Sequence, residues 1–162
     1  MDLNKTSPIP DEYMIFALLL ILSNRMDTLL ERELKEFDVT AKQWFLSATI
    51  EKLFDNPPTM KAVAREMGSS HQNIKQVALK LQEKGLLILE KDRKDARVTR
   101  LRMTEQSHAF WGKVNEKGNA FMDKMYKDIE KKDLAKSGEA LQKILLNMQK
   151  MDNESNDEME EP

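Results

Sequence analysis

One stretch of the sequence, residues 59–103, decides the fold: TMKAVAREMGSSHQNIKQVALKLQEKGLLILEKDRKDARVTRLRM. The spacing of apolar residues in its first part predicts a short helix over residues 60–67, which Gly68 ends. The same spacing predicts a second helix over residues 70–84, which Gly85 ends. Two short helices separated by a tight glycine turn form a helix-turn-helix.

The period of the apolar residues changes immediately after this second helix. Residues 86–90 form a short apolar run typical of a strand, residues 91–97 form a polar turn, and residues 98–103 alternate apolar and basic side chains. A hairpin that follows a helix-turn-helix is a wing. The stretch therefore predicts a winged helix-turn-helix.

Helical periodicity dominates on both sides of this stretch. It predicts further helices over residues 11–37, 40–54, 104–129 and 133–150. We therefore expect a mainly α fold with a small β-hairpin wing and about six helices. The expected divisions are an N-terminal helix at 1–38, the winged helix-turn-helix at 39–103, C-terminal helices at 104–151 and a disordered acidic tail at 152–162; the family resemblance described below implies that the helices at 1–38 and 104–151 are the dimerisation helices of a dimeric protein.

The first predicted helix is apolar around most of its N-terminal half. Its apolar residues recur at spacings of three and four, and three more widen the stripe: Phe16, Leu20 and Ile21. A helix that is apolar nearly all round must be covered on several sides, which predicts burial in a subunit interface. The alternative is that the rest of the same chain covers it.

The formal charge of −2 is distributed unevenly along the chain. Residues 61–102 hold 11 basic and 5 acidic side chains, a net charge of +6, whereas residues 152–162 hold 6 acidic side chains and no basic one. A local positive charge in a mildly acidic protein is the pattern expected where one face of the molecule meets nucleic-acid phosphates.

Composition argues against several classes of protein. The absence of cysteine excludes disulfides, thiolate metal sites and thiol redox sensing. His71 and His108 lack partners at the spacing of a metal site on a helix, so neither a metal nor another cofactor is expected. The sequence also has no glycine-rich phosphate loop and no nucleophile elbow, so we do not expect an enzyme.

The longest apolar run, residues 14–22, argues against a membrane protein. It has nine residues, fewer than the roughly 20 that a bilayer-spanning helix needs. No basic segment precedes the run and no small-residue cleavage site follows it, so a signal peptide is not expected either. We therefore expect a cytoplasmic protein without a membrane partner.

The start of the second helix of the helix-turn-helix carries the candidate base-reading residues. In such motifs this part of the helix enters the major groove of double-stranded DNA. Asparagine and glutamine pair with adenine, lysine reaches guanine or a phosphate, and the helix start binds phosphate through its amides. The candidates are Ser70, His71, Gln72, Asn73, Lys75 and Gln76. Considered alone, polar residues on an exposed helix face are also ordinary.

Basic residues crowd the predicted tip of the wing, where like charges repel one another unless a phosphate backbone meets them. We expect Arg93 and Lys94 to face a narrow minor groove of DNA. Arg97 is also a DNA-binding candidate, and we expect it to pair with Asp95 and so stiffen the hairpin. Asp92 is expected to support the wing in the same way.

Residues 92–105 resemble the wing signature of MarR-type transcriptional regulators, which is D-x-R-D-x-R ahead of a strand and an L-T-x-x-G helix start. The helix start at residues 40–44, the helix end at residues 81–86 and the order of six helices also agree with that family. The departures from its pattern are Lys94 in place of the usual arginine, Ala96 in place of a frequent basic residue and Ser107 in place of a frequent glycine.

The resemblance implies a homodimer built from the first and the last two helices, which presents two recognition helices to a pseudo-palindromic operator. It also implies a repressor that is released by a small aromatic or phenolic ligand, bound between the dimerisation helices and the DNA-binding part. Aromatic residues that could line such a pocket are Trp44, Phe45, Phe110 and Trp111, although such a cluster is more often plain core.

A different interpretation is a winged-helix module that binds a protein partner through its apolar helices and acidic tail, without specific DNA binding. The net charge of +6 on residues 61–102 argues against this interpretation, because a protein contact does not need it. A steep loss of DNA affinity with rising salt would distinguish DNA binding from this alternative.

Overall fold

The computed structural model describes the backbone of residues 9–160 and the side chains of residues 9–152. Within these residues the fold is mainly helical, with six α-helices and one two-stranded antiparallel hairpin, which confirms the predicted fold class. The elements are α1 (Asp11–Leu34), the 3₁₀ turn η1 (Lys35–Phe37), α2 (Ala41–Leu53), α3 (Met60–Glu66), α4 (His71–Glu83), β1 (Leu87–Lys91), β2 (Thr99–Met103), α5 (Glu105–Met125) and α6 (Lys131–Glu160). The chain divides into two compact units, residues 1–122 and residues 123–162.

Side-chain caps define where the helices of the head begin, where "the head" denotes residues 41–103, from α2 to β2. At the start of α2, Thr40 and Gln43 form a reciprocal capping box, with N–O distances of 3.2 and 3.0 Å. The hydroxyls of Thr59 and Ser70 accept hydrogen bonds from the third amides of α3 and α4, at 3.1 and 3.2 Å. Each of these caps was readable from the sequence.

Glycines in the left-handed conformation end the two helices of the helix-turn-helix. Gly68 follows α3 with a φ of 56°, and Gly85 follows α4 with a φ of 69°. A residue with a side chain would be strained at such angles, so glycine is the residue that lets the chain turn there. The turn after Gly68 leads directly into the cap of α4, as the sequence predicted.

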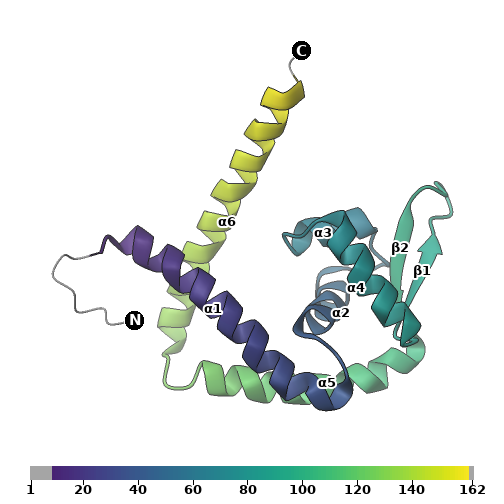
Figure 1. Ribbon diagram of the computed structural model, residues 1–162, viewed down its shortest axis with the longest axis horizontal. Helices are drawn as coiled ribbons and strands as arrows, with labels where there is room; N and C mark the ends of the chain where they lie inside the picture. The colour runs from purple at the N-terminus through teal and green to yellow at the C-terminus, as the bar shows by residue number, and fades with distance from the viewer. Residues whose placement is uncertain (1–8, 161–162) are drawn as a thin grey trace. The chain divides into compact units, whose positions relative to one another are not determined.

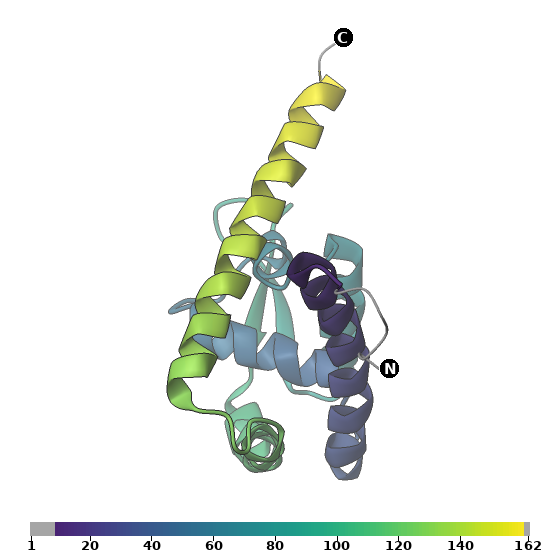
Figure 2. The same cartoon turned by 90° about the vertical axis from the view of Figure 1, so that its left-hand side faces the viewer.

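The wing is the β1–β2 hairpin. Its register pairs Leu87 with Met103 at the base and Lys91 with Thr99 toward the tip. The strands begin one residue later than predicted. In both views of the structure the tip of the hairpin points away from α5, which follows the base of β2 (Figures 1 and 2).

One apolar core closes the head and joins it to α5. It contains buried side chains from every element of the head and from α5, including Leu46, Val63, Ile74, Leu81, Leu101 and Trp111, each at most 2% exposed. Because the apolar face of α4 is buried in this core, the opposite face of the helix is exposed to solvent.

Two helices end differently from the expectation. The first predicted helix stops at Leu34 and continues as η1, because Asp38 adopts a left-handed φ of 53° before the next cap. Helix α5 ends at Met125 rather than near Ile129, and Asp128 in the connection to α6 has a φ of 62°. Aspartate tolerates this conformation better than most residues, which is why the sequence alone did not mark either turn.

Helix α6 extends beyond the predicted range in both directions, to Lys131 and Glu160 (Figure 2). The tail predicted to be disordered, residues 152–162, is therefore helical as far as Glu160, and residues 161–162 lie outside the described part. A helix that is already formed propagates into the following residues without a new nucleation cost, and four of residues 152–160 are glutamate or methionine, which are good helix formers. Disorder was predicted from the high charge of this segment alone.

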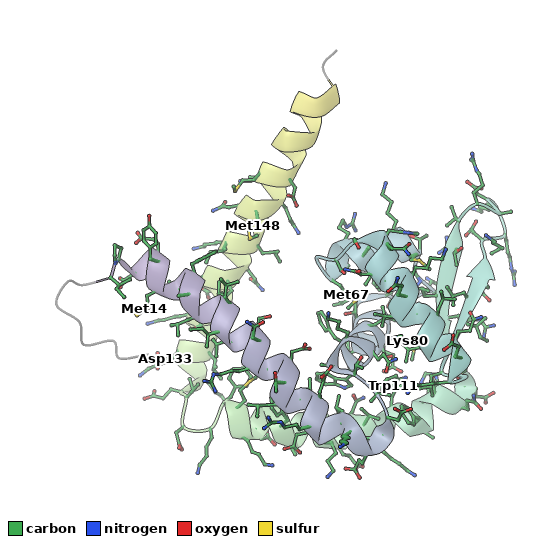
Figure 3. The ribbon with its side chains drawn as sticks, viewed as in Figure 1. Met14, Met67, Lys80, Trp111, Asp133 and Met148 are labelled. Atoms are coloured by element: carbon green, nitrogen blue, oxygen red, sulfur yellow. The ribbon has the colours of Figure 1, made fainter. Side chains whose placement is uncertain are left out.

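Helix α1 differs from the rest of its unit in its exposed apolar surface. Only Leu30 and Leu34, near its C-terminal end, are buried, whereas nine large apolar side chains between Tyr13 and Leu29 are exposed. Figure 3 marks the N-terminal end of this helix with Met14. By length and composition alone the segment Asp11–Phe37 is apolar enough to cross a membrane. Counting only the uninterrupted apolar run of nine residues missed this property, because the mean hydropathy of a longer segment stays high even when the segment includes a few polar residues.

Candidate nucleic-acid interface

The outward face of α4 presents a continuous set of polar side chains. Ile74, Ala78 and Leu81 are buried in the core, so the opposite face of the helix is turned outward. The predicted reading residues that are exposed are His71, Gln72, Asn73, Lys75 and Gln76. Within the described residues, none of these five side chains takes part in a hydrogen bond or ion pair, so their donors and acceptors are available to a ligand.

Ser70 has a different position from these five residues. Its hydroxyl already accepts a hydrogen bond from the amide of Asn73, so its first role is to begin α4. The amides of the first helical turn have no acceptor inside the helix, and the positive end of the helix dipole lies at the same place. This end of α4 can therefore bind a phosphate while the side chains after it face the bases.

The tip of the wing is ordered by the carboxylate of Asp92. One oxygen accepts hydrogen bonds from the amides of Lys94 and Asp95, at 2.8 and 3.0 Å. The other oxygen accepts a hydrogen bond from the Nε of Arg100. The Arg100 contact and the two backbone amides stabilise the charged carboxylate, which lowers the pKa of Asp92 to about 2. Asp92 supports the wing, and the exposed side chains of Arg93 and Lys94 flank this turn.

Arg97 pairs with Asp95, as the sequence predicted. The guanidinium donates through Nε and Nη2 to the two carboxylate oxygens at 3.1 and 3.2 Å, and the amide of Arg97 adds a third hydrogen bond at 3.0 Å. These bonds lower the pKa of Asp95. The Arg97 side chain is 91% exposed. Its remaining N–H groups can still reach a phosphate, but two of its donors are already used.

Arg100 is a residue that the sequence reasoning did not single out. Its Nη1 donates to the carbonyl oxygen of Pro57 at 2.8 Å, and the next residue, Leu101, donates its amide to the carbonyl oxygen of Pro58 at 2.9 Å. The alternation along β2 placed Arg100 on the polar face of the hairpin. No signal in the sequence marked its acceptor, which lies 43 residues earlier in the chain.

Two further polar contacts attach the end of α4 to its surroundings. The Oε1 of Gln82 accepts a hydrogen bond from the amide of Leu89 in β1 at 3.1 Å. The ammonium of Lys84 lies 2.7 Å from a carboxylate oxygen of Asp38, in the turn before α2. Both contacts join segments that are adjacent only in the folded chain, and together they restrain the recognition helix at the end opposite to its reading residues.

The four aromatic residues predicted to line a ligand pocket lie in different environments. Phe110 contacts Trp111 edge-to-face, with ring centroids 5.0 Å apart. Trp44 donates from Nε1 to the Oδ1 of Asn115, in the same helix as Phe110 and Trp111, at 2.8 Å. Phe45 is half exposed. The structure thus places part of the predicted set in the core and part on the surface.

Trp111, which is labelled in Figure 3, is only 2% exposed. Its Nε1 has no hydrogen-bond partner among the residues that the structure describes. A buried N–H without an acceptor is destabilising by about 1–3 kcal/mol. An acceptor brought by a bound molecule would remove this cost.

Comparison with known proteins identifies the fold. No protein-family model matches the chain, and no curated protein sequence matches it. Among solved structures, AbsC, a MarR family transcriptional regulator from Streptomyces coelicolor, superposes with a TM-score of 0.76 at 17% identity, covering 90% of this chain and 99% of that one. This chain has the MarR-type winged helix-turn-helix fold.

Two other structures with the MarR-type fold were solved with a bound molecule. The MepR–DNA complex of S. aureus matches with a TM-score of 0.74 at 15% identity, over 83% of this chain and 97% of that one. An organohalide-sensing transcriptional regulator in its 2,4-dichlorophenol-bound form matches with a TM-score of 0.71 at 15% identity, over 89% and 88%. AbsC and the organohalide-sensing protein are both transcriptional regulators.

Proposed function

We propose that the protein is a sequence-specific, DNA-binding transcriptional regulator that acts as a homodimer inside the cell. The observation that carries this proposal is the outward face of α4, where five polar side chains are exposed and unpaired within the described part of the chain. The basic tip of the hairpin belongs to the same head, which therefore offers both base-reading groups and positive charge.

The exposed apolar surface of helix α1 is the observation that supports a dimer. Its exposed apolar side chains include Phe16 at 64%, Leu20 at 54% and Leu22 at 47%. A contiguous apolar surface of this kind is unfavourable in water and favours association with a matching surface. A second copy of the chain is the partner we propose, because two heads related by a two-fold axis would read the two halves of a pseudo-palindromic operator.

Release by a small aromatic or phenolic ligand is the finer part of the proposal. The unpaired Nε1 of Trp111, beside the ring of Phe110, supports it, because a phenolic oxygen would accept that N–H and stack against the aromatic ring. A solved neighbour with the same fold binds 2,4-dichlorophenol. A ligand that prefers a head separation unsuited to DNA would weaken operator binding and so relieve repression.

Selection of bound sequences from a random pool of double-stranded DNA tests the function directly. We expect an inverted repeat with half-sites about one helical turn, roughly 10–10.5 base pairs, apart. Affinity for the selected site should fall steeply as salt is raised from about 50 to 200 mM. Recovery of no consensus, together with salt-independent binding, would instead favour a module that binds protein.

A further inference from the structure

The middle of β2 is bound to the segment that leads into the helix-turn-helix. Residues 57–59 immediately precede α3, and β2 runs beside them. An isolated antiparallel bridge pairs Thr59 with Arg100, and the amide of Leu101 donates to the carbonyl oxygen of Pro58 at 2.9 Å. These contacts are separate from the β1–β2 pairing, so β2 belongs both to the wing and to the approach to α3.

The side chain of Arg100 joins the tip of the wing to the same segment. Its Nη1 donates to the carbonyl oxygen of Pro57 at 2.8 Å, and its Nε donates to the carboxylate of Asp92. The second oxygen of that carboxylate holds the amides of Lys94 and Asp95. A single guanidinium thus connects the turn between the strands with the loop before α3.

Arg100 is also well placed to stay in one conformation. Its side chain is 37% exposed and that of Asp92 only 13% exposed, so the pair is shielded from solvent more than the tip residues are. The planar guanidinium donates hydrogen bonds to two fixed acceptors, and these bonds restrain its orientation as well as its position. A lysine could keep the charge but could not hold both acceptors in this fork geometry.

We propose that Arg100 is a positioning residue, which fixes the angle between the wing and the helix-turn-helix so that α4 and the wing tip engage adjacent grooves together. This inference rests on the proposed DNA-binding function. If the wing were free to swing, ordering it on DNA would cost conformational entropy, and the tip contacts would contribute less to affinity. Arg100 acts through Arg93 and Lys94 and does not itself contact the bases.

Arg102 provides a matched control. It is two residues further along β2, carries the same charge on the same side of the strand, and pairs with Glu90 across the hairpin at 3.0 Å. Its bond lies entirely within the wing and does not reach residues 57–59. Arg100→Gln and Arg102→Gln therefore remove equal charge, but only the first removes the connection to the helix-turn-helix.

A double-mutant cycle on the selected operator tests the proposal. Arg100→Gln should weaken binding about tenfold, in line with the loss of charged hydrogen bonds, whereas Arg102→Gln should weaken it clearly less. In a background carrying Arg93→Ala and Lys94→Ala, the effect of Arg100→Gln should shrink to less than about twofold. An equal loss in both backgrounds, with a salt slope lowered by about one, would mean that Arg100 contacts phosphate directly and would overturn the proposal.

Amide hydrogen exchange provides a second test that does not depend on DNA. In Arg100→Gln the amides of Lys94, Asp95 and Leu101 should exchange about tenfold or more faster than in Arg102→Gln, with the exchange of α4 unchanged. Equal exchange in the two variants would overturn the positioning role even if the wild-type protein binds DNA. If the wild-type protein binds no DNA, the proposed function fails, while exchange still decides whether Arg100 holds the wing.

Discussion

Helices α4 and α1 both carry apolar and polar residues, yet they differ in how far the rest of the chain buries their apolar side. In α4 the apolar side is closed by the core of the head, and the side left to solvent is polar. In α1 the exposed side is apolar over most of its length, and burial is limited to Leu30 and Leu34. The difference indicates that α4 is prepared for a polar, charged ligand, whereas α1 needs another apolar surface.

The exposed surfaces of the two helices also differ in how favourably they interact with water. The exposed amides and ammonium of α4 are well solvated, so the head is stable without DNA, and DNA binding replaces water by base edges and phosphates. The exposed leucines of α1 gain nothing from water, and their burial is favourable by about 25 cal/mol for each Å² removed from solvent. We therefore expect changes in α1 to have the largest effects.

The largest effect is expected from Leu18→Glu combined with Leu22→Glu in α1. Both side chains are exposed, at 42% and 47%, so the head should still fold, but charge on this face should prevent the apolar association. Sedimentation analysis should show a monomer, and operator affinity should fall by at least about 100-fold because the second head no longer binds intramolecularly.

Leu53→Glu is the control for this change, since Leu53 is a 60% exposed leucine of α2 outside the α1 surface. It should leave the oligomeric state unchanged. A wild-type protein that is already monomeric would contradict the dimer. If that monomer also bound lipid vesicles through α1, the partner of this face would be a membrane rather than a second copy.

The next effects concern the reading face of α4 and the wing tip. Asn73→Ala or Gln72→Ala should reduce discrimination between the operator and single-base variants by about 1–3 kcal/mol. Arg93→Ala should instead weaken binding to all sequences similarly and lower the salt slope by about one. Competition binding at several salt concentrations measures both quantities. Unchanged affinity after Arg93→Ala would contradict the role of the wing.

A similar but purely structural effect is expected where the head packs on α5. A Cβ on Gly118 would lie 2.8 Å from the ring of Trp44, so Gly118→Ala should lower the free energy of unfolding by about 1–3 kcal/mol. Gly112, in the same helix, has open space at that position, and Gly112→Ala should stabilise the protein by up to about 1 kcal/mol. Urea unfolding compares the two variants, and equal effects would show that the contact with Trp44 is not tight.

The smallest expected effect is the pH dependence of the wing. The pKa of Asp92 is about 2 in the folded protein against 3.8 ordinarily, so its charged form stabilises the wing fully above about pH 4, and this contribution is lost as the pH falls toward 2. A carboxyl NMR titration should give a midpoint of about 2, which Arg100→Gln moves toward 3.8 and Arg102→Gln leaves in place. An unchanged midpoint in Arg100→Gln would show that Arg100 is not the cause of the lowered pKa of Asp92.

Much of the head could be predicted from local chemistry. Caps at Thr40 and Ser70 and the glycines at positions 68 and 85 depend on a few neighbouring residues, so their signals are complete within one short window. The pairing of Asp95 with Arg97 was readable for the same reason, because a single residue lies between the partners. The outward direction of Gln72 and Asn73 followed from the helical period of the apolar residues Ile74, Ala78 and Leu81.

The partners of Arg100, Gln82 and Trp44 could not be predicted. Each lies on another element, and a single sequence does not tell which carbonyl, amide or aromatic edge the packing brings near. The environments of the aromatic residues could not be predicted either, since Phe45 is half exposed whereas Trp111 is buried. The extent of α6 was missed because charge was weighed without the helix preference of the same residues.

The sequence by itself determined the order of the elements, the helix-turn-helix with its wing, and the polar identity of the reading face, because these follow from periodicity and from short-range caps and turns. Only the tertiary structure decided how the wing is held against residues 57–59 and that α1 keeps its apolar side exposed. Contacts between distant residues and the burial of a face depend on how whole elements pack, and packing is a property of the folded chain rather than of any one segment.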